Sequence, residues 1–357
     1  MTRKIFHLSY DHIISPENLL GAWREFIHGK RHKRDVQEFH FRLMDNLLSL
    51  QRDLQNQTYC HGPYQHFRIH DPKPRDIHKA SVRDRLVHHA IYRALYWFYH
   101  QVFISDSYSC RLGKGTLRAI NRFRGLAYEV SQNHTRTCWV LKCDIRKFFA
   151  SIDQATLLSI LRERITDQDI LWLLEQVIGS FHSMQNGVGL PLGNLTSQLF
   201  VNVYLNEFDQ FMKRELKVKH YLRYADDFVL LSDDCSWLEN QLPLIDQFLT
   251  EKLKLALHPD KIVLKTISSG LDFLGWVHFT DHRVLRTMMR RRMLARLKGN
   301  QSPETLNSYL GLIRHGNTYK LEGKLWKNLS FIPTAGRGGI RVRPAPAPLS
   351  LTAPARY

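Results

Sequence analysis

The sequence predicts an α+β fold in which a small antiparallel sheet is flanked by helices. Two short apolar runs, at 221–224 and 228–232, flank two adjacent aspartates, which predicts a β-hairpin. The apolar run 137–144 ends in another aspartate and predicts a buried strand. Residues 86–103 instead repeat apolar side chains at helical spacing. With 357 residues, 43% of them hydrophobic, the chain is long enough to bury a sizeable core.

The chain carries a large positive charge. Its 51 Lys and Arg outnumber 33 Asp and Glu, which gives a net charge of +18. Such an excess is typical of a surface that follows a polyanion, with membrane binding as the alternative. No apolar run approaches the roughly 18 residues of a membrane span, and the start lacks the apolar core of a signal peptide. We therefore expect an intracellular protein with no membrane association.

The cysteines form no recognisable framework. They are odd in number and scattered, without a Cys-x-x-Cys pair, which argues against both a disulfide scaffold and a zinc ribbon. We interpret them as buried or incidental thiols. They are Cys60, Cys110, Cys138, Cys143 and Cys235.

The first 60 residues are predicted to be helical. Apolar side chains recur at helical spacing over 36–54, which favours a helix in this stretch. These side chains are Phe39, Leu43, Leu47, Leu50 and Leu54. The basic run 30–34 before them fits nucleic-acid contact and a solvated loop equally well.

The segment 64–85 has a different character. It is typical of a β pair interrupted by prolines, which belongs at a sheet edge or in a loop. A Gly- and cation-rich loop follows at 107–118 and opens into a helix, where backbone N–H groups and Lys114 are able to meet a phosphate. The alternative is an ordinary turn, and the spacing is not that of a P-loop.

The two adjacent carboxylates at the hairpin tip carry the clearest chemical signal. Turns prefer Asn-Gly or Asp-Gly and neighbouring like charges repel, so folding alone does not explain Asp226 and Asp227. A divalent cation resolves the repulsion, and Mg²⁺ binds carboxylate oxygens while keeping phosphate or water oxygens in its other positions. The pair therefore indicates a metal site for phosphoryl transfer. The alternative is a solvated Asp-rich turn.

A third acid and a polar helix start complete the candidate site. Asp144 ends a buried strand just before a helix start, which suits a third metal ligand. The alternative is a helix N-cap, a role that suits Asp153 better because Asp153 immediately precedes a helical stretch. The turn 189–198 leads into a long helix, and its polar residues 194–198 would face whatever occupies the site.

In this order the segments resemble the palm of a reverse transcriptase. Asp144 ends a strand with aromatic residues shortly after it, a Pro-x-Gly turn at 191–193 enters a helix, and Tyr-Ala-Asp-Asp at 224–227 forms a hairpin. Outside the palm, 75–85 resembles the fingers strand and basic loop, and 107–120 resembles the Ser-Tyr-x-x-Arg-x-Gly stretch of the group II intron lineage.

The resemblance extends toward the C-terminus. Residues 258–262 are similar to the motif that carries a lysine near the triphosphate, and 270–276 is similar to the primer grip. The resemblance implies a right-hand polymerase built from fingers, palm and thumb, encoded by a bacterium, an archaeon or a phage and working in the cytoplasm. The implied divisions are an N-terminal helical extension 1–60, fingers 61–135, palm 136–280 with finger elements at about 155–190, a helical thumb 281–332 and a flexible tail 333–357.

The resemblance also implies roles for individual residues. Asp144, Asp226 and Asp227 would be catalytic and, with Ile145, would hold two Mg²⁺, with Mn²⁺ as a possible substitute. Phe149 would exclude a 2′-hydroxyl, or else is simply core. Nucleotide-binding residues would be Arg75, Lys79, Phe149, Leu192, Gly193, Gln198 and Lys261, of which Lys261 has a solvated cation as its alternative. The primer grip would be Phe273, Leu274, Gly275 and Trp276.

Within the lineage, the turn 189–198 discriminates between classes. Group II intron and retron enzymes generally carry Pro-Gln-Gly and then Ser-Pro, whereas enzymes of diversity-generating retroelements carry an aliphatic residue before the Gly and Ser-Gln after it. Leu192 and Gln198 match the second pattern. The resemblance implies an RNA-directed DNA polymerase that copies a template-repeat RNA into cDNA with errors at adenines. Its partners would be template RNA, primer or target DNA, dNTPs and a small basic accessory variability protein.

Two other functions stay open from the sequence. One is a group II intron-derived or defence-associated reverse transcriptase with the same chemistry and no mutagenic role. The other is a non-catalytic RNA-binding protein that keeps the palm as a scaffold. The second is disfavoured because three uncompensated carboxylates in a basic, polyanion-binding cleft make little sense without metal.

Overall fold

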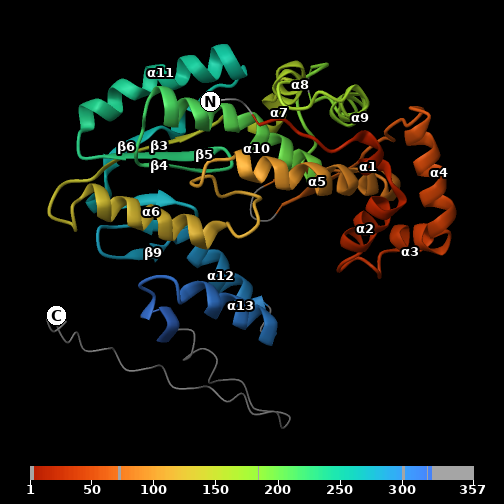
Figure 1. Cartoon of the computed structure of the whole chain (residues 1–357). Coiled ribbons are helices and arrows are strands. Elements are labelled where there is room, and N and C mark those ends of the chain that lie inside the picture. Colours follow the sequence, from red (N-terminus) through yellow and green to blue (C-terminus); the bar gives the residue numbers. More distant parts are fainter. Residues whose placement is uncertain (1–3, 71–73, 184, 300–301, 320, 324–357) are drawn as a thin grey trace, which may run out of the picture. The chain divides into compact units, whose positions relative to one another are not determined.

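The computed structural model describes residues 4–70, 74–183, 185–299, 302–319 and 321–323. The chain divides into two compact units, Met1–Arg286 and Thr287–Tyr357. The predicted α+β class is confirmed, because small antiparallel sheets are flanked by helices throughout the first unit (Figure 1). The tail expected at 333–357 lies outside the described residues.

The first 60 residues are helical, as predicted. Four helices form this region: α1 (Tyr10–Ile14), α2 (Pro16–Phe26), α3 (Arg34–Phe41) and α4 (Leu43–Gln55). The single helix expected over 36–54 is wrong, because Arg42 leaves the helical conformation with φ −119° and ψ 44°. The break turns the chain so that Phe39 of α3 contacts Trp23 of α2, with ring centroids 5.3 Å apart, while Leu50 of α4 is also buried.

The predicted β pair is present. Strands β1 (Gln65–Ile69) and β2 (Arg75–Lys79) pair antiparallel, with Gln65 opposite Lys79. Helix α5 (Val82–Val102) begins four residues before the expected 86 because the Ser81 side chain caps it, accepting a hydrogen bond from the Asp84 N–H.

The central sheet has the strand order β4-β5-β3-β6. Its strands are β3 (Trp139–Asp144), β4 (Tyr221–Tyr224), β5 (Asp227–Ser232) and β6 (Val263–Thr266). The hairpin prediction is confirmed with one difference, since Asp227 is the first residue of β5 and pairs with Tyr224. The tip is therefore the two-residue turn Ala225-Asp226, in which Ala225 has φ +55°.

Both faces of this sheet are covered, because alternate side chains of β3 enter different clusters. Leu141 and Cys143 join the core that includes helices α10 (Leu195–Gln210) and α11 (Cys235–Leu253). Val140 joins the second cluster with α6 (Thr116–Val130). Figure 1 shows α11 and α6 on opposite sides of the strands.

A third sheet follows the central one. It consists of β7 (Leu271–Phe273), β8 (Trp276–His278) and β9 (Arg283–Leu285). The helix expected after residue 280 is wrong at 283–285, because Leu285 pairs with Trp276 and extends the sheet by one strand. Helices α12 (Thr287–Gly299) and α13 (Pro303–Ile313) belong to the second unit.

Shorter elements complete the first unit. They are α7 (Phe148–Ser151), α8 (Gln154–Arg162), α9 (Gln168–Ile178), the π-helix η1 (Phe211–Glu215) and the 3₁₀-helices η2 (Pro259–Lys261) and η3 (Ile267–Ser269). Asp153 caps α8, as predicted, by accepting from the Thr156 N–H. All five cysteines are free thiols, and Cys138 and Cys143 are buried whereas Cys60 and Cys110 are exposed. Across the described ranges, no helix combines the length and the apolar character needed to cross a membrane.

Candidate functional site

The fold brings three carboxylates together at one end of the central sheet. Asp144 ends β3 and is the register partner of Asp227, which begins β5. Asp226 lies in the adjoining turn, and its carbonyl accepts a hydrogen bond from the Ile145 N–H at 3.3 Å. Residues separated by more than 80 positions in the sequence therefore share one site. The structure thus places these acids and Ile145 side by side, and their roles stay a prediction.

The acids repel one another in this enclosed position. Burial, followed by the charge of Asp144, raises the pKa of Asp226 to about 6. Burial also raises the pKa of Asp227, and the ammonium of Lys142 works against that rise. Both shifts mean that negative charge is disfavoured here unless a cation compensates it.

Two lysines supply cations at the site. The Nζ of Lys261 donates to Asp144 Oδ1 at 2.6 Å, which places the predicted Lys261 directly beside an acid. The Nζ of Lys142 lies 3.7 Å from Asp227 Oδ1. Sequence analysis missed Lys142, although strand periodicity places it two residues before Asp144 on the same face of β3.

The donor set is chemically suited to a hard divalent cation. Carboxylate oxygens are the ligands that Mg²⁺ prefers. One positive charge, the Lys261 ammonium, already contacts Asp144 in this structure. Within the described part of the chain, no three His, Cys, Asp or Glu side chains converge as a preformed metal site. In this structure the Lys261 ammonium is bonded to Oδ1 of Asp144.

Phe149 lies beside the polar turn that precedes α10. Its carbonyl accepts from the Leu190 N–H at 2.8 Å, and the Gly189 N–H donates to Ile152 at 2.7 Å. The Phe149 ring is partly buried against the core, whereas Phe148 is 2% exposed. Phe149 thus keeps some exposed surface next to the turn, in contrast to its neighbour.

The same turn is tied to strand β2. The Leu192 carbonyl accepts from the His78 N–H at 3.1 Å, and the Asn194 amide donates to the His78 carbonyl at 2.9 Å. Gly193 has φ +108°, and a Cβ there would lie 3.0 Å from Ile77 Cγ2, so this position requires glycine.

The predicted fingers cations have different surroundings. Arg75 is exposed at the start of β2. Lys79 is partly buried and its Nζ lies 2.7 Å from Asp35 Oδ2 of α3. Arg85 binds the same Asp35 oxygen at 2.7 Å. Lys79 can therefore reach a phosphate only by leaving Asp35.

A cavity of about 380 Å³ lies between these elements. It brings together the predicted residues Lys79, Gly193 and Gln198. Its other walls include Lys30, which belongs to the basic run 30–34, and Phe26, which no local pattern in the sequence relates to α10.

The predicted primer-grip residues form a tight hairpin. Phe273 and Trp276 are register partners and both are buried. Leu274 and Gly275 make the turn between them, with φ of +51° and +86°. The Lys142 Nζ donates to the Asp272 carbonyl at 3.0 Å, so this hairpin is connected to the strand that carries Asp144.

Comparison with known proteins identifies the family. The reverse transcriptase (RNA-dependent DNA polymerase) family matches residues 70–278, which is more than half of the chain. Protein YkfC of Escherichia coli K12 is 26% identical, over 78% of this chain and 83% of that protein. The group II intron-encoded protein LtrA of Lactococcus lactis is 25% identical, over 73% of this chain and only 53% of LtrA.

Solved structures with a partly similar backbone fold include apo telomerase from Candida tropicalis. That similarity has a TM-score of 0.48 at 12% identity, and covers 68% of this chain and 60% of the telomerase chain. From the family match and the similarity to YkfC and LtrA, the chain belongs to the reverse transcriptase (RNA-dependent DNA polymerase) family and is related to YkfC and the group II intron-encoded enzymes.

Proposed function

We propose that this chain extends a DNA primer on an RNA template at Asp144, Asp226 and Asp227. The observation that carries the proposal is the register pairing of Asp144 with Asp227, next to the turn that holds Asp226. This acid cluster lies inside the segment that matches the reverse transcriptase family. In this proposal, 1–60 is an N-terminal extension, 61–135 the fingers, 136–280 the palm and 281–332 the thumb.

The three carboxylates would hold the metal. When bound, two Mg²⁺, or Mn²⁺ in their place, lower the pKa of the primer 3′-hydroxyl and compensate charge on the triphosphate. In this proposal Asp144 releases Lys261, whose Nζ lies 2.6 Å from Oδ1 of Asp144 in the structure. The released ammonium is then available to the leaving pyrophosphate. Lys142 stays beside Asp227 and limits the repulsion between the acids.

Other residues would orient the nucleotide. Arg75 is exposed on β2 and is free to approach the triphosphate, and Lys79 would join it after leaving Asp35. Phe149 would lie beneath the deoxyribose and exclude a 2′-hydroxyl by steric contact. Leu192, Gly193 and Gln198 would border the base pair, since the turn that contains Leu192 is bonded to β2 through His78. The 273–276 hairpin would position the primer end.

A finer proposal concerns the product. Leu192 and Gln198 resemble the pattern of diversity-generating retroelement enzymes. We therefore infer that the chain copies a template-repeat RNA with errors at adenines, in company with a small basic accessory protein, for targeted sequence diversification. Leu192 offers neither a donor nor an acceptor from its side chain, so a hydrogen bond that would seat the nucleotide is missing at this position.

A second candidate is a group II intron-like or defence-associated enzyme with ordinary fidelity. It is favoured by the similarity to LtrA, a group II intron-encoded protein. A genomic neighbourhood with two repeats that differ only at adenines of one copy supports the mutagenic role, and an intron around the gene supports the alternative.

The test is primer extension with purified protein, an RNA template of defined sequence, dNTPs and either Mg²⁺ or a chelator. We expect extension only with the divalent ion, and cDNA sequences with errors concentrated opposite template adenines. Accurate cDNA would retain the polymerase function and reject the mutagenic role. Absence of extension together with intact RNA binding would instead favour a non-catalytic RNA-binding protein.

A further inference from the structure

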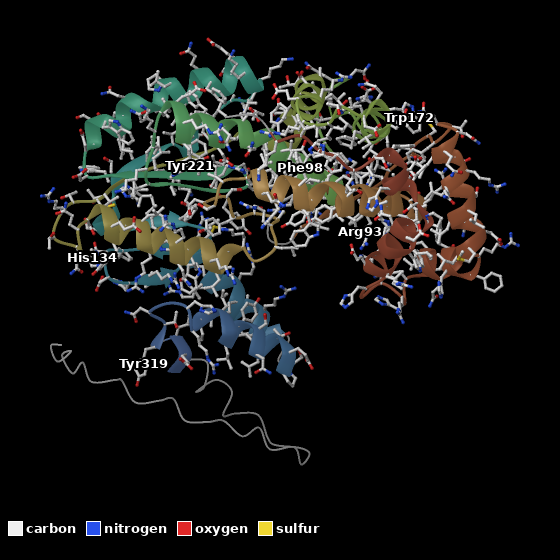
Figure 2. The ribbon with its side chains drawn as sticks, in the orientation of Figure 1. Arg93, Phe98, His134, Trp172, Tyr221 and Tyr319 are labelled. Carbon is white, nitrogen blue, oxygen red and sulfur yellow. The ribbon has the colours of Figure 1, made fainter. Side chains whose placement is uncertain are left out.

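A buried ionic network lies directly behind the Ala225-Asp226 turn. Arg223 of β4 and Asp209 of α10 form an ion pair with Nη2–Oδ2 2.6 Å, and their side chains are 1% and 0% exposed. The Arg223 Nε donates to the other Asp209 oxygen at 2.8 Å, so the pair is bidentate. Tyr221, labelled on the central sheet in Figure 2, donates its hydroxyl to the same Oδ1 at 2.8 Å.

Every N–H group of the Arg223 guanidinium has an acceptor. Two of its five N–H groups bind Asp209, and a third donates from Nη2 to Ser107 Oγ at 3.2 Å. The Nη1 group donates to Asn202 Oδ1 at 3.4 Å and to the Ala225 carbonyl at 3.1 Å. Lysine carries only three donors on a single nitrogen and cannot reproduce this fork.

Stability alone does not account for this arrangement. A buried ion pair is often replaceable by apolar residues without loss of stability, because desolvation of the charges offsets their attraction. The network has instead a specific link to the catalytic turn through the Ala225 carbonyl. The Ala225 carbonyl and the Asp226 N–H belong to the same planar peptide unit. The hydrogen bond from Arg223 to this carbonyl therefore fixes the orientation of the peptide plane that leads into Asp226.

The turn needs such support. Ala225 has φ +55°, a left-handed conformation that a residue with a Cβ keeps only when its surroundings fix it. On its other side, the Asp226 carbonyl is held by the Ile145 N–H at 3.3 Å. The turn is therefore fixed from β3 and from the guanidinium of Arg223.

We propose that Arg223, held by Asp209, is a positioning residue that sets the placement of Asp226 and Asp227 through the Ala225 carbonyl. This inference rests on the proposed role of these two acids in polymerisation. A misplacement of about 1 Å in catalytic groups lowers rates by on the order of 100-fold. The effect is expected on turnover, with the affinity for template and primer preserved.

The main test is Arg223→Lys, which keeps the charge opposite Asp209 and removes the fork. The variant strand keeps its backbone anchors, because Arg223 N–H donates to Asp106 and its carbonyl accepts from Tyr108, both at 2.9 Å. We expect kcat for nucleotide incorporation to fall about 10- to 100-fold with KM and duplex affinity unchanged. Amide hydrogen exchange of the peptide that contains 225–227, measured without divalent ions, should become faster.

Arg122→Lys is the matched control. Arg122 forms a similar two-point pair with Asp106, Nε–Oδ1 3.0 Å and Nη2–Oδ2 3.4 Å, on α6 rather than at the turn. We expect this control to retain both the rate and the exchange of the 225–227 peptide. Equal slowing in both variants would overturn the proposal in favour of a general effect of weakened ion pairs.

If Arg223→Lys does not fold, the double variant Asp209→Asn with Arg223→Gln tests the positioning role instead. This variant leaves no unpaired buried charge. We expect it to fold with slow incorporation and faster turn exchange. A folded variant with the wild-type rate, or with slow turnover but unchanged turn exchange, overturns the proposal. Failure of both variants to fold assigns the network a purely structural role. A wild-type chain inactive on RNA templates would reject the proposed function rather than this inference.

Discussion

Asp144 and Asp227 are direct register partners on neighbouring antiparallel strands. Such partners have Cβ atoms about 4.5 to 5.5 Å apart, so the sheet itself holds the two carboxylates at a fixed spacing. The sheet therefore fixes the backbones of these two acids next to each other, and the adjoining turn adds Asp226.

Asp227→Asn should abolish polymerisation while leaving the fold intact. The amide keeps the size of the side chain but removes a charge that a divalent ion needs, so incorporation should fall at least about 100-fold. Asp233→Asn, at the exposed end beyond β5, is the control and should leave the rate unchanged. Primer extension on an RNA template measures both variants. Wild-type activity in Asp227→Asn would reject the assigned role of this acid.

Asp226→Asn should stabilise the protein at neutral pH in the absence of divalent ions. The folded-state pKa of Asp226 is raised from 3.8 to about 6, so the folded state binds this proton more tightly than the unfolded chain does. The stabilising contribution is complete below 3.8 and is lost as the pH rises through about 6. We expect a gain on the order of 1 to 3 kcal/mol at pH 7.5 and almost none at pH 3.5.

Thermal unfolding of the wild type and Asp226→Asn at both pH values, in chelator, checks this expectation. Added Mg²⁺ should reverse the order at pH 7.5 by stabilising the wild type alone. Equal melting temperatures at pH 7.5 in chelator would contradict the raised pKa of Asp226.

Phe149→Ala should relax sugar discrimination. The substitution opens space beside the 189–192 turn without removing an acid, so ribonucleotide incorporation should rise about 10-fold or more while deoxynucleotide incorporation persists. Phe148→Leu is the control, since Phe148 is buried in the core and its change should alter stability rather than selection. Competition between rNTPs and dNTPs in primer extension distinguishes the two. Unchanged discrimination between ribonucleotides and deoxynucleotides would show that Phe149 only packs in the core.

Leu192→Gln should lower misincorporation opposite template adenines. A restored hydrogen bond of about 0.5 to 1.5 kcal/mol that acts only on the correctly seated nucleotide changes selection by roughly 2- to 10-fold. The control is Leu117→Gln on α6, where the side chain is already 39% exposed. Sequencing of cDNA from one adenine-containing template is the measurement. An active variant with an unchanged error spectrum refutes the idea, and parallel loss of stability and activity shows that Leu192 only packs the turn.

Affinity for a template–primer duplex should depend steeply on salt. The net charge of +18 implies that binding comes mainly from cations on phosphates. The logarithm of the association constant should then fall linearly with the logarithm of salt concentration, by roughly 0.9 for each B-DNA phosphate neutralised. Fluorescence anisotropy over a salt series measures the slope. A flat dependence would contradict a basic binding surface.

The sequence predicted those elements whose signal is local. The hairpin around Asp226, the strand that ends in Asp144 and the N-cap at Asp153 all follow from periodicity and composition within a few residues, and the structure contains each of them. The close approach of Lys261 to an acid also agrees with its predicted place near the site, although its role stays a prediction.

Features that depend on pairing between distant segments were missed. The helix breaks at Arg42 because Phe39 of α3 packs against Trp23 of α2, a contact that local propensity does not reveal. Residues 283–285 form a strand because β8 offers an edge with which they pair. Strand periodicity places Lys142 on the same face as Asp144, but its proximity to Asp227 depends on the register of β3 with β5, which no local pattern reveals. The Arg223–Asp209 pair likewise joins a strand to a helix, and no spacing in the sequence connects them.

The core that joins the N-terminal helices to the strands of the central sheet has an evolutionary consequence. Side chains of the first 60 residues, such as Leu19 and Leu50, belong to the same buried cluster as Leu141 and Phe228 of the central sheet. A gene that lost this segment would expose the apolar face of α5 at once, so the helices cannot be gained or shed as an independent module. A chain without this segment would need polar residues on that face of α5 or another cover for it.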